Sequence, residues 1–170
     1  MDVDKLKKQQ AILKQTYREE PESALCTMSV TGTLCPEQLR ITVPTHAGQI
    51  DAGFHVAAGG DGEDACSGDM LLEALVGCAG VTLVAVATAM NISLQNGTVT
   101  AEGDLDFRGT LGVDKEAPVG FREIRLRFDL STPASADEVE KLVSLTERYC
   151  VIYQTLHRAN RIETQITHSA

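Results

Sequence analysis

Residues 70–90 have the sequence MLLEALVGCAGVTLVAVATAM, and this stretch decides the fold of the chain. It is apolar on nearly every face of a helix, so the helix must be buried on all sides, either in a membrane or in a protein core. The flanks favour a core, because Glu73 lies inside the stretch and no Lys or Arg occurs between Arg40 and Arg108. A membrane span usually has basic residues at its cytoplasmic end and tolerates a carboxylate poorly. We therefore predict a central core helix and no membrane partner.

The length and charge of the chain limit its architecture and its partners. A chain of 170 residues forms one domain but rarely surrounds a helix completely. We therefore expect a homodimer, in which a sheet and a second subunit sandwich the central helix. A net charge of -9 argues against nucleic acid or an anionic membrane surface as partner, because both require clustered Lys and Arg.

The segments before the central helix predict a helix followed by strands. Residues 3–18 have the pattern of a short amphipathic helix. Residues 24–54 alternate β-branched and polar side chains between Gly and Pro residues, which predicts two or three antiparallel strands. Residues 57–69 form an acidic, glycine-rich loop, in which Ser67 or Asp69 is a candidate N-cap of the central helix.

The segments after the central helix complete an α+β layout. Residues 97–112 and 119–131 alternate apolar and polar side chains, which predicts the two long strands of a hairpin. Residues 135–157 have helical spacing with a break near Cys150, and residues 162–169 resemble a closing strand. The predicted order is strands, helix, strands, helix and strand, which is an α+β fold.

The cysteine pattern indicates a reducing compartment. The chain has five cysteines at wide, irregular spacings without a CxxC pair, namely Cys26, Cys35, Cys66, Cys78 and Cys150. An odd number excludes a complete intramolecular disulfide framework, and the spacing does not suit zinc. The N-terminus lacks the apolar run of a secretory signal, so we expect a cytoplasmic protein.

Two of these cysteines are candidates for chemistry. Cys78 lies midway along the central helix between Gly77 and Gly80, where small residues permit close approach of another chain or a substrate. Cys150 follows polar residues near the break in the last helix. Two thiols brought together from distant helices suggest peroxide reduction, in which one thiolate becomes a sulfenic acid and the other resolves it as a disulfide. The alternative for any single cysteine is a buried small hydrophobic residue.

Two segments resemble the OsmC/Ohr family of thiol peroxidases. They are CSGDMLLEALVGCAGVTL and, some seventy residues later, TERYCVIYQTL. The family combines an LLxALxxC run in an apolar central helix with a second cysteine in a YC or HC segment followed by TL. The matching residues here are Leu71, Leu72, Ala74, Leu75, Cys78, Tyr149, Cys150, Thr155 and Leu156. The likeness covers roughly residues 24–168, and the helical extension at residues 1–20 lies outside it.

The resemblance implies a single OsmC-like domain over residues 1–170. It implies an intertwined homodimer in which two antiparallel sheets wrap around the central helices, with active sites at the subunit interface. It also implies reduction of organic hydroperoxides by a dithiol reductant, without metal or organic cofactor. The resemblance implies that Cys78 is the peroxidatic thiol and Cys150 is the resolving thiol.

The chain departs from the family in the groups that activate the thiol. The best-characterised members have an NPE or PxE segment before the helix, and its Glu works with an Arg on the reactive thiol. Here the segment is SGD, and Asp69 is the nearest carboxylate. The loop contains no Arg, so the guanidinium candidates are Arg18, Arg40 and Arg148.

His55 and Cys66 flank the same loop and are possible accessory residues, His55 as a proton acceptor and Cys66 as a third redox thiol. Two other functions stay open. One is a non-catalytic stress or binding protein that keeps the fold and a pocket for a small apolar ligand. The other is a hydrolase with Cys78 as nucleophile and His55 as base, which requires the two side chains to lie close together.

Overall fold

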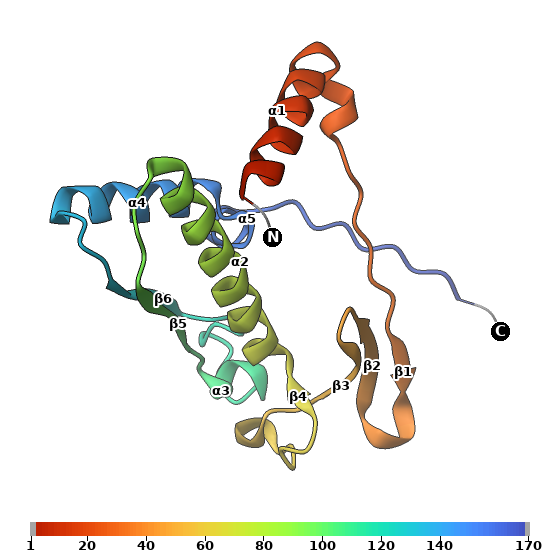
Figure 1. Cartoon of the computed structure of the whole chain (residues 1–170). Helices are drawn as coiled ribbons and strands as arrows, with labels where there is room; N and C mark the ends of the chain where they lie inside the picture. Colours follow the sequence, from red (N-terminus) through yellow and green to blue (C-terminus); the bar gives the residue numbers. More distant parts are fainter. Residues whose placement is uncertain (1–2, 169–170) are drawn as a thin grey trace.

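The computed structural model describes residues 3–168 and has the predicted α+β fold (Figure 1). A four-stranded sheet precedes the central helix. Its strands are β1 (Thr33–Cys35), β2 (Arg40–Thr45), β3 (Gly48–Gly53) and β4 (Ala65–Cys66). β1, β2 and β3 are antiparallel, which confirms the strands predicted within residues 24–54. The short strand β4 pairs in parallel with β3, inside the segment that was predicted to be a loop.

The central helix α2 (Ser67–Met90) buries one stripe of its surface. The buried residues are Leu75, Ala79, Leu83 and Ala87, which recur every four residues and therefore share one face. Leu83 and Ala87 pack with Leu142 in a hydrophobic core cluster. The predicted role of residues 70–90 as a core helix agrees with this packing.

The opposite face of α2 is open within one chain. Val81 is 74% exposed and Val84 is 59% exposed. The helix was predicted to be buried on all sides, but only one side is buried within one chain. The elements that contact α2 are chiefly α4, α5 and β5, and they do not cover its other side. By length and composition α2 is able to cross a bilayer, but a helix with one packed stripe is also typical of a protein core.

The second sheet is an antiparallel pair of β5 (Asn96–Asp104) and β6 (Glu123–Ser131). In β6, half-buried and exposed residues alternate, which confirms the predicted apolar side. The first strand ends at Asp104 and not at residue 112 as predicted. The reason is an N-cap: the side chain of Asp106 accepts a hydrogen bond from the Arg108 N–H and starts the short helix α3 (Phe107–Thr110).

The last helical region consists of α4 (Ala136–Tyr149) and α5 (Val151–His157), so the predicted break near Cys150 is confirmed. A capping box starts α4. The Ser135 hydroxyl accepts from the Glu138 N–H, and the Glu138 carboxylate accepts from the Ser135 N–H. These contacts fix the start of the helix that carries Leu142 into the core.

The two ends of the described chain lie away from the body (Figure 1). α1 (Val3–Glu19) has the predicted extent, and none of its residues is buried. A strand was predicted at residues 162–169. Residues 162–168 form no strand, and residue 169 lies outside the described residues. A strand needs a neighbour for its N–H and C=O groups, and within the described chain this segment has none in either sheet. Ile162 and Ile166 are both 88% exposed.

Candidate active site

The helix α2 holds Cys78 in a half-buried position. The glycines beside it differ in their surroundings. A Cβ on Gly77 would meet nothing within 4 Å, whereas a Cβ on Gly80 would lie 3.8 Å from Val99. The surface beside Gly77 is therefore open, and it leaves room for another molecule near the thiol.

Cys150 occupies the junction between α4 and α5 and is completely buried. Its N–H donates to the carbonyl of Thr146 at 2.9 Å and closes the end of α4. Its Sγ accepts a hydrogen bond from the Tyr153 N–H at 3.4 Å and serves as the N-cap of α5. The same residue thus ends one helix and begins the next, which fixes the position of the sulfur.

The structure brings Cys78 and Cys150 together, because α2 packs against α4 and α5. Interaction with the Cys150 side chain is one of the causes that lower the pKa of Cys78. The backbone N–H groups of Val151 and Ile152, at the start of α5, and the hydroxyl of Thr82, one turn farther along α2, are donors to Cys78. These groups all favour the ionised form of Cys78.

This arrangement separates the pKa values of the two thiols. Burial opposes ionisation of Cys78, but the hydrogen bonds from Ile152, Cys150, Val151 and Thr82 outweigh it and lower the pKa of Cys78. Burial raises the pKa of Cys150, and the neighbouring Cys78 raises it further. Cys78 therefore ionises at lower pH than Cys150, and a nucleophilic thiol next to a resolving thiol requires this order.

Asp69 is not brought to Cys78 within one chain. It lies in the first turn of α2 and is exposed. Nine residues separate it from Cys78, which corresponds to a rise of about 13 Å and a rotation of about 180° along an α-helix. The N-cap of α2 is Cys66, so neither predicted candidate, Ser67 or Asp69, holds that position.

Two of the candidate arginines lie on the surface. Arg18 is in the last turn of α1 and is exposed. The Arg148 guanidinium lies 5.5 Å from the centre of the Tyr149 ring, in a cation–π contact on the outside of α4. Neither contributes to the lowered pKa of Cys78, whose donors are all uncharged groups.

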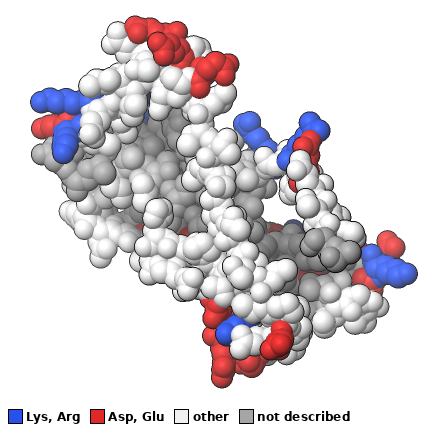
Figure 2. All heavy atoms as spheres, turned by 90° about the vertical axis from the view of Figure 1, so that its right-hand side faces the viewer, with Lys and Arg blue, Asp and Glu red and all other residues white. Residues whose placement is uncertain are grey.

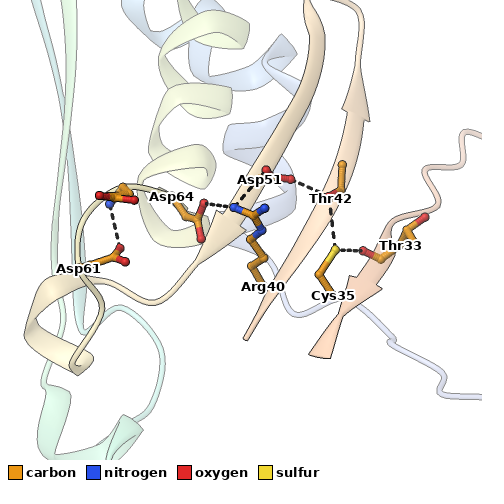
Figure 3. Close-up of polar contacts among 8 residues, drawn as sticks. Thr33, Cys35, Arg40, Thr42, Asp51, Asp61 and Asp64 are labelled. Carbon is orange, nitrogen blue, oxygen red and sulfur yellow. Dashed lines mark hydrogen bonds and ion pairs between the residues drawn. The ribbon is translucent and has the colours of Figure 1, made fainter. Parts of the chain in front are cut away.

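The third candidate, Arg40, belongs to the first sheet (Figure 3). Its Nη1 lies 3.4 Å from carboxylate oxygens of both Asp51 and Asp64. Asp51 in turn accepts a hydrogen bond of 2.6 Å from the Thr42 hydroxyl. The Nε of Arg40 is buried without a hydrogen-bond partner among the described residues. Arg40 therefore takes part in an ion-pair network near the start of α2, away from Cys78.

His55 and Cys66 share a second region of the protein, a cavity of about 900 Å³. The His55 ring stacks on Phe107 at 5.0 Å, and its Nδ1 accepts a hydrogen bond from the Ala57 N–H at 3.0 Å. The cavity is lined mostly by apolar side chains from the first sheet, the start of α2 and α3, and Arg40 also reaches it. Cys78 is not among its lining residues, so one chain does not give the hydrolase alternative its Cys78–His55 contact.

No group of three or more His, Cys, Asp or Glu side chains within residues 3–168 is arranged to hold a metal ion. The candidate site consists of the two thiols and the groups that lower the pKa of Cys78. Analysis of the sequence missed Thr82 and the N–H groups of Val151 and Ile152. Thr82 carried a usable signal, because it lies four residues after Cys78 and so shares its helix face.

Comparisons with known proteins identify the fold. Residues 60–165 match the family model described as OsmC-like protein. An OsmC-like protein from Mycoplasma pneumoniae is similar in structure, with a TM-score of 0.64 and 19% identity over 78% of this chain and 88% of that chain. Among curated protein sequences no match was found.

Two further similar structures have names that refer to hydroperoxides. One is an organic hydroperoxide resistance protein from Legionella pneumophila, with a TM-score of 0.60 and 18% identity over 78% of this chain and 91% of that chain. The other is an organic hydroperoxide resistance protein from Elizabethkingia anophelis, with a TM-score of 0.61 and 16% identity over 79% of this chain and 91% of that chain. At these identities the likeness concerns the fold.

Proposed function

The chain belongs to the OsmC-like protein family, and on this premise we propose that it is a thiol peroxidase that reduces organic hydroperoxides through Cys78 and Cys150. The observation that carries the proposal is the contact between the two thiols, with the pKa of Cys78 lowered and that of Cys150 raised. The names of the structures from Legionella pneumophila and Elizabethkingia anophelis support hydroperoxides as the substrate class.

The reaction begins with the Cys78 thiolate. Its sulfur attacks the terminal oxygen of the hydroperoxide ROOH, the O–O bond breaks, and the leaving alkoxide takes one proton to become the alcohol ROH. Cys78 is now a sulfenic acid, oxidised by two electrons. The Cys150 thiol attacks its sulfur, which forms a disulfide and releases water. A dithiol reductant then exchanges with the disulfide, becomes oxidised itself, and restores both thiols.

We place this activity in a cytoplasmic homodimer. Two features support a second copy of the chain. The open face of α2 exposes apolar side chains, and the segment at residues 158–168 has backbone groups outside any helix or sheet, so a partner chain is able to cover both. Figure 2 shows that on the face of the molecule turned toward the viewer most charged residues lie toward the margins. In a dimer, Arg40 or Asp69 of one subunit is a candidate to reach the site of the other.

A second candidate function rests on a different observation, the apolar cavity of about 900 Å³ beside Cys66. A cavity of this size with few polar groups is typical of a site for a small apolar ligand. In this alternative the protein binds such a ligand without turnover, and the thiol pair is only structural.

The test is consumption of cumene hydroperoxide in the presence of dithiothreitol. We expect multiple turnovers by the natural chain and a loss of at least ~100-fold in Cys78→Ser, because the thiolate is the nucleophile. Without dithiothreitol, Cys150→Ser should consume one equivalent of hydroperoxide and then stop as a sulfenic acid. Cys26→Ser is the matched control, since Cys26 is exposed and distant in sequence from both thiols, and it should keep full activity.

A natural chain that consumes no hydroperoxide beyond the rate of dithiothreitol alone would contradict the proposal. Equal activity in Cys78→Ser and the natural chain would do the same. Saturable binding of an apolar fluorescent probe without turnover would favour the ligand-binding alternative.

A further inference from the structure

The N-terminal helix α1 leaves its apolar side largely uncovered within the described chain. This apolar stripe consists of Val3, Leu6, Leu13 and Tyr17, which lie within about 80° of one another around the helix. Val3, Leu13 and Tyr17 are 44%, 46% and 41% exposed. The main contact of α1 is with the short helix η1 (Pro21–Ala24). A helix of 17 residues is only marginally stable in water unless such a face packs on another surface.

A row of cations borders the apolar stripe. This basic stripe consists of Lys7, Lys14 and Arg18, which lie within about 40° of one another on the side of the apolar stripe next to Val3. None of the three forms an ion pair with a carboxylate among the described residues. The helix therefore matches a surface that is apolar in one part and acidic in the adjacent part.

Such a surface lies beside the cavity of about 900 Å³. Four of the side chains that line it are large, apolar and exposed and form the cavity rim, namely Leu34, Leu39, Phe54 and Val119. The loop at residues 57–69 borders the cavity, because Ala58 and Cys66 also line it. Between these two residues lie Asp61 and Glu63, which are exposed and form no ion pair within residues 3–168.

The two surfaces lie at opposite ends of one chain. Figure 1 shows α1 at the top of the molecule, whereas β4 and α3, which lie beside the cavity, are toward the bottom. In the proposed homodimer a second copy supplies each chain with the surface that it lacks, and a twofold arrangement makes the same contact occur twice. The opposite charges of the basic stripe and the loop favour this contact.

We propose that α1 of one copy docks on a second copy, with its apolar stripe against the cavity rim and its basic stripe facing Asp61 and Glu63. This contact rests on the proposed homodimer and is independent of the thiol chemistry. It gives a function to the N-terminal extension that lies outside the family pattern, because α1 becomes an element of the dimer. It also covers the cavity with a segment of the protein in place of a small ligand.

The test exchanges charges between the two surfaces in separate chains. In the first chain, Lys7→Glu and Lys14→Glu reverse the basic stripe. In the second chain, Asp61→Asn and Glu63→Lys reverse the loop, and the new amide oxygen replaces the carboxylate oxygen that accepts the N–H of residue 63. Each chain alone should form a homodimer whose dissociation constant is raised roughly tenfold at low salt, because like charges then face each other.

An equal mixture of the two chains distinguishes a contact between copies from a contact within one chain. One chain is labelled with nitrogen-15, and native mass spectrometry counts homodimers and mixed dimers after exchange. At low salt the mixed dimer should exceed its statistical share of one half, since both of its contacts join opposite charges. At high salt the excess should disappear, because exposed charges are screened. A statistical mixture at low salt would overturn the inference.

The apolar stripe is tested by two neighbouring residues of α1. Leu13→Asp should raise the dissociation constant of the homodimer roughly tenfold, because it removes apolar area from the contact. Ile12→Asp is the matched control and should stay within about twofold, because Ile12 is 68% exposed and lies on the other side of the helix. Equal effects of the two changes would contradict the contact. Binding to vesicles of anionic phospholipid that Leu13→Asp abolishes, together with a statistical mixture, would place α1 on a membrane instead.

The cysteines are unchanged in all these chains, so the proposed function is tested separately by hydroperoxide turnover. Turnover together with a statistical mixture overturns the α1 contact and leaves the peroxidase function standing. An excess of mixed dimer without turnover supports the contact and removes the peroxidase function. A natural chain that stays monomeric at micromolar concentration overturns both the contact and the homodimer.

Discussion

The helix α2 has one cysteine at its N-terminal end, Cys66, and one in its middle, Cys78, and their surroundings differ. In the middle of α2, the Cys150 thiol and the start of α5 lower the pKa of Cys78, and Leu83 farther along the helix belongs to the hydrophobic core. At the N-terminal end, Cys66 lies beside an open apolar cavity and a stacked His55, near the ion pairs of Arg40. In the proposed function, the lowered pKa of Cys78 and the neighbouring Cys150 thiol distinguish Cys78 from Cys66.

The largest predicted difference between the two regions of α2 is in the free energy of unfolding. Leu83→Ala should lower the free energy of unfolding by about 2–5 kcal/mol, because Leu83 is 3% exposed and fills the core. Leu71→Ala, a matched change at the other end of the same helix, should cost about 1 kcal/mol or less, since Leu71 is 36% exposed and lines the cavity.

Chemical denaturation of both variants at several protein concentrations measures these costs. A loss at Leu71 as large as that at Leu83 would mean that the cavity end is packed in solution, as a second subunit or a bound ligand would achieve. The contrast between the two ends would then belong to the isolated chain only.

The sequence predicted the surroundings of Cys78 better than the cavity near Cys66. The apolar run of residues 70–90 and the break at Cys150 are local patterns, and each is confirmed by α2 and by the junction of α4 and α5. The contact of Cys78 with Cys150 was expected from the family resemblance, while spacing alone did not establish it. Which backbone N–H groups meet the sulfur depends on how α5 packs against α2, and no local pattern encodes that packing.

The mistaken boundaries have physical causes. The strand predicted to run to residue 112 ends at Asp104, because Asp106 caps α3. That signal was present, since an Asp just before a short helical turn is a common N-cap. The strand predicted at residues 162–169 depends on a pairing partner that one chain does not supply, and such long-range pairing is invisible in the alternation of side chains.

A smaller effect is expected in the pH dependence of the two paired thiols. The pKa of Cys78 is lowered and that of Cys150 is raised, so the thiolate of Cys78 forms at lower pH. As pH rises from 6, alkylation of Cys78 should therefore increase first and that of Cys150 last. Peptide mass spectrometry of the alkylated chain follows both residues in one sample. The reverse order would contradict the assignment of Cys78 as nucleophile.

The most direct test of the thiol pair is to map the disulfide formed after addition of one equivalent of cumene hydroperoxide to the fully reduced chain. Free thiols are then blocked by alkylation, and the remaining bridge is identified from proteolytic peptides. The account predicts a bridge between Cys78 and Cys150 within one chain, with Cys66 alkylated. Bridges that involve only Cys26, Cys35 or Cys66, with Cys78 and Cys150 still reduced, would contradict it.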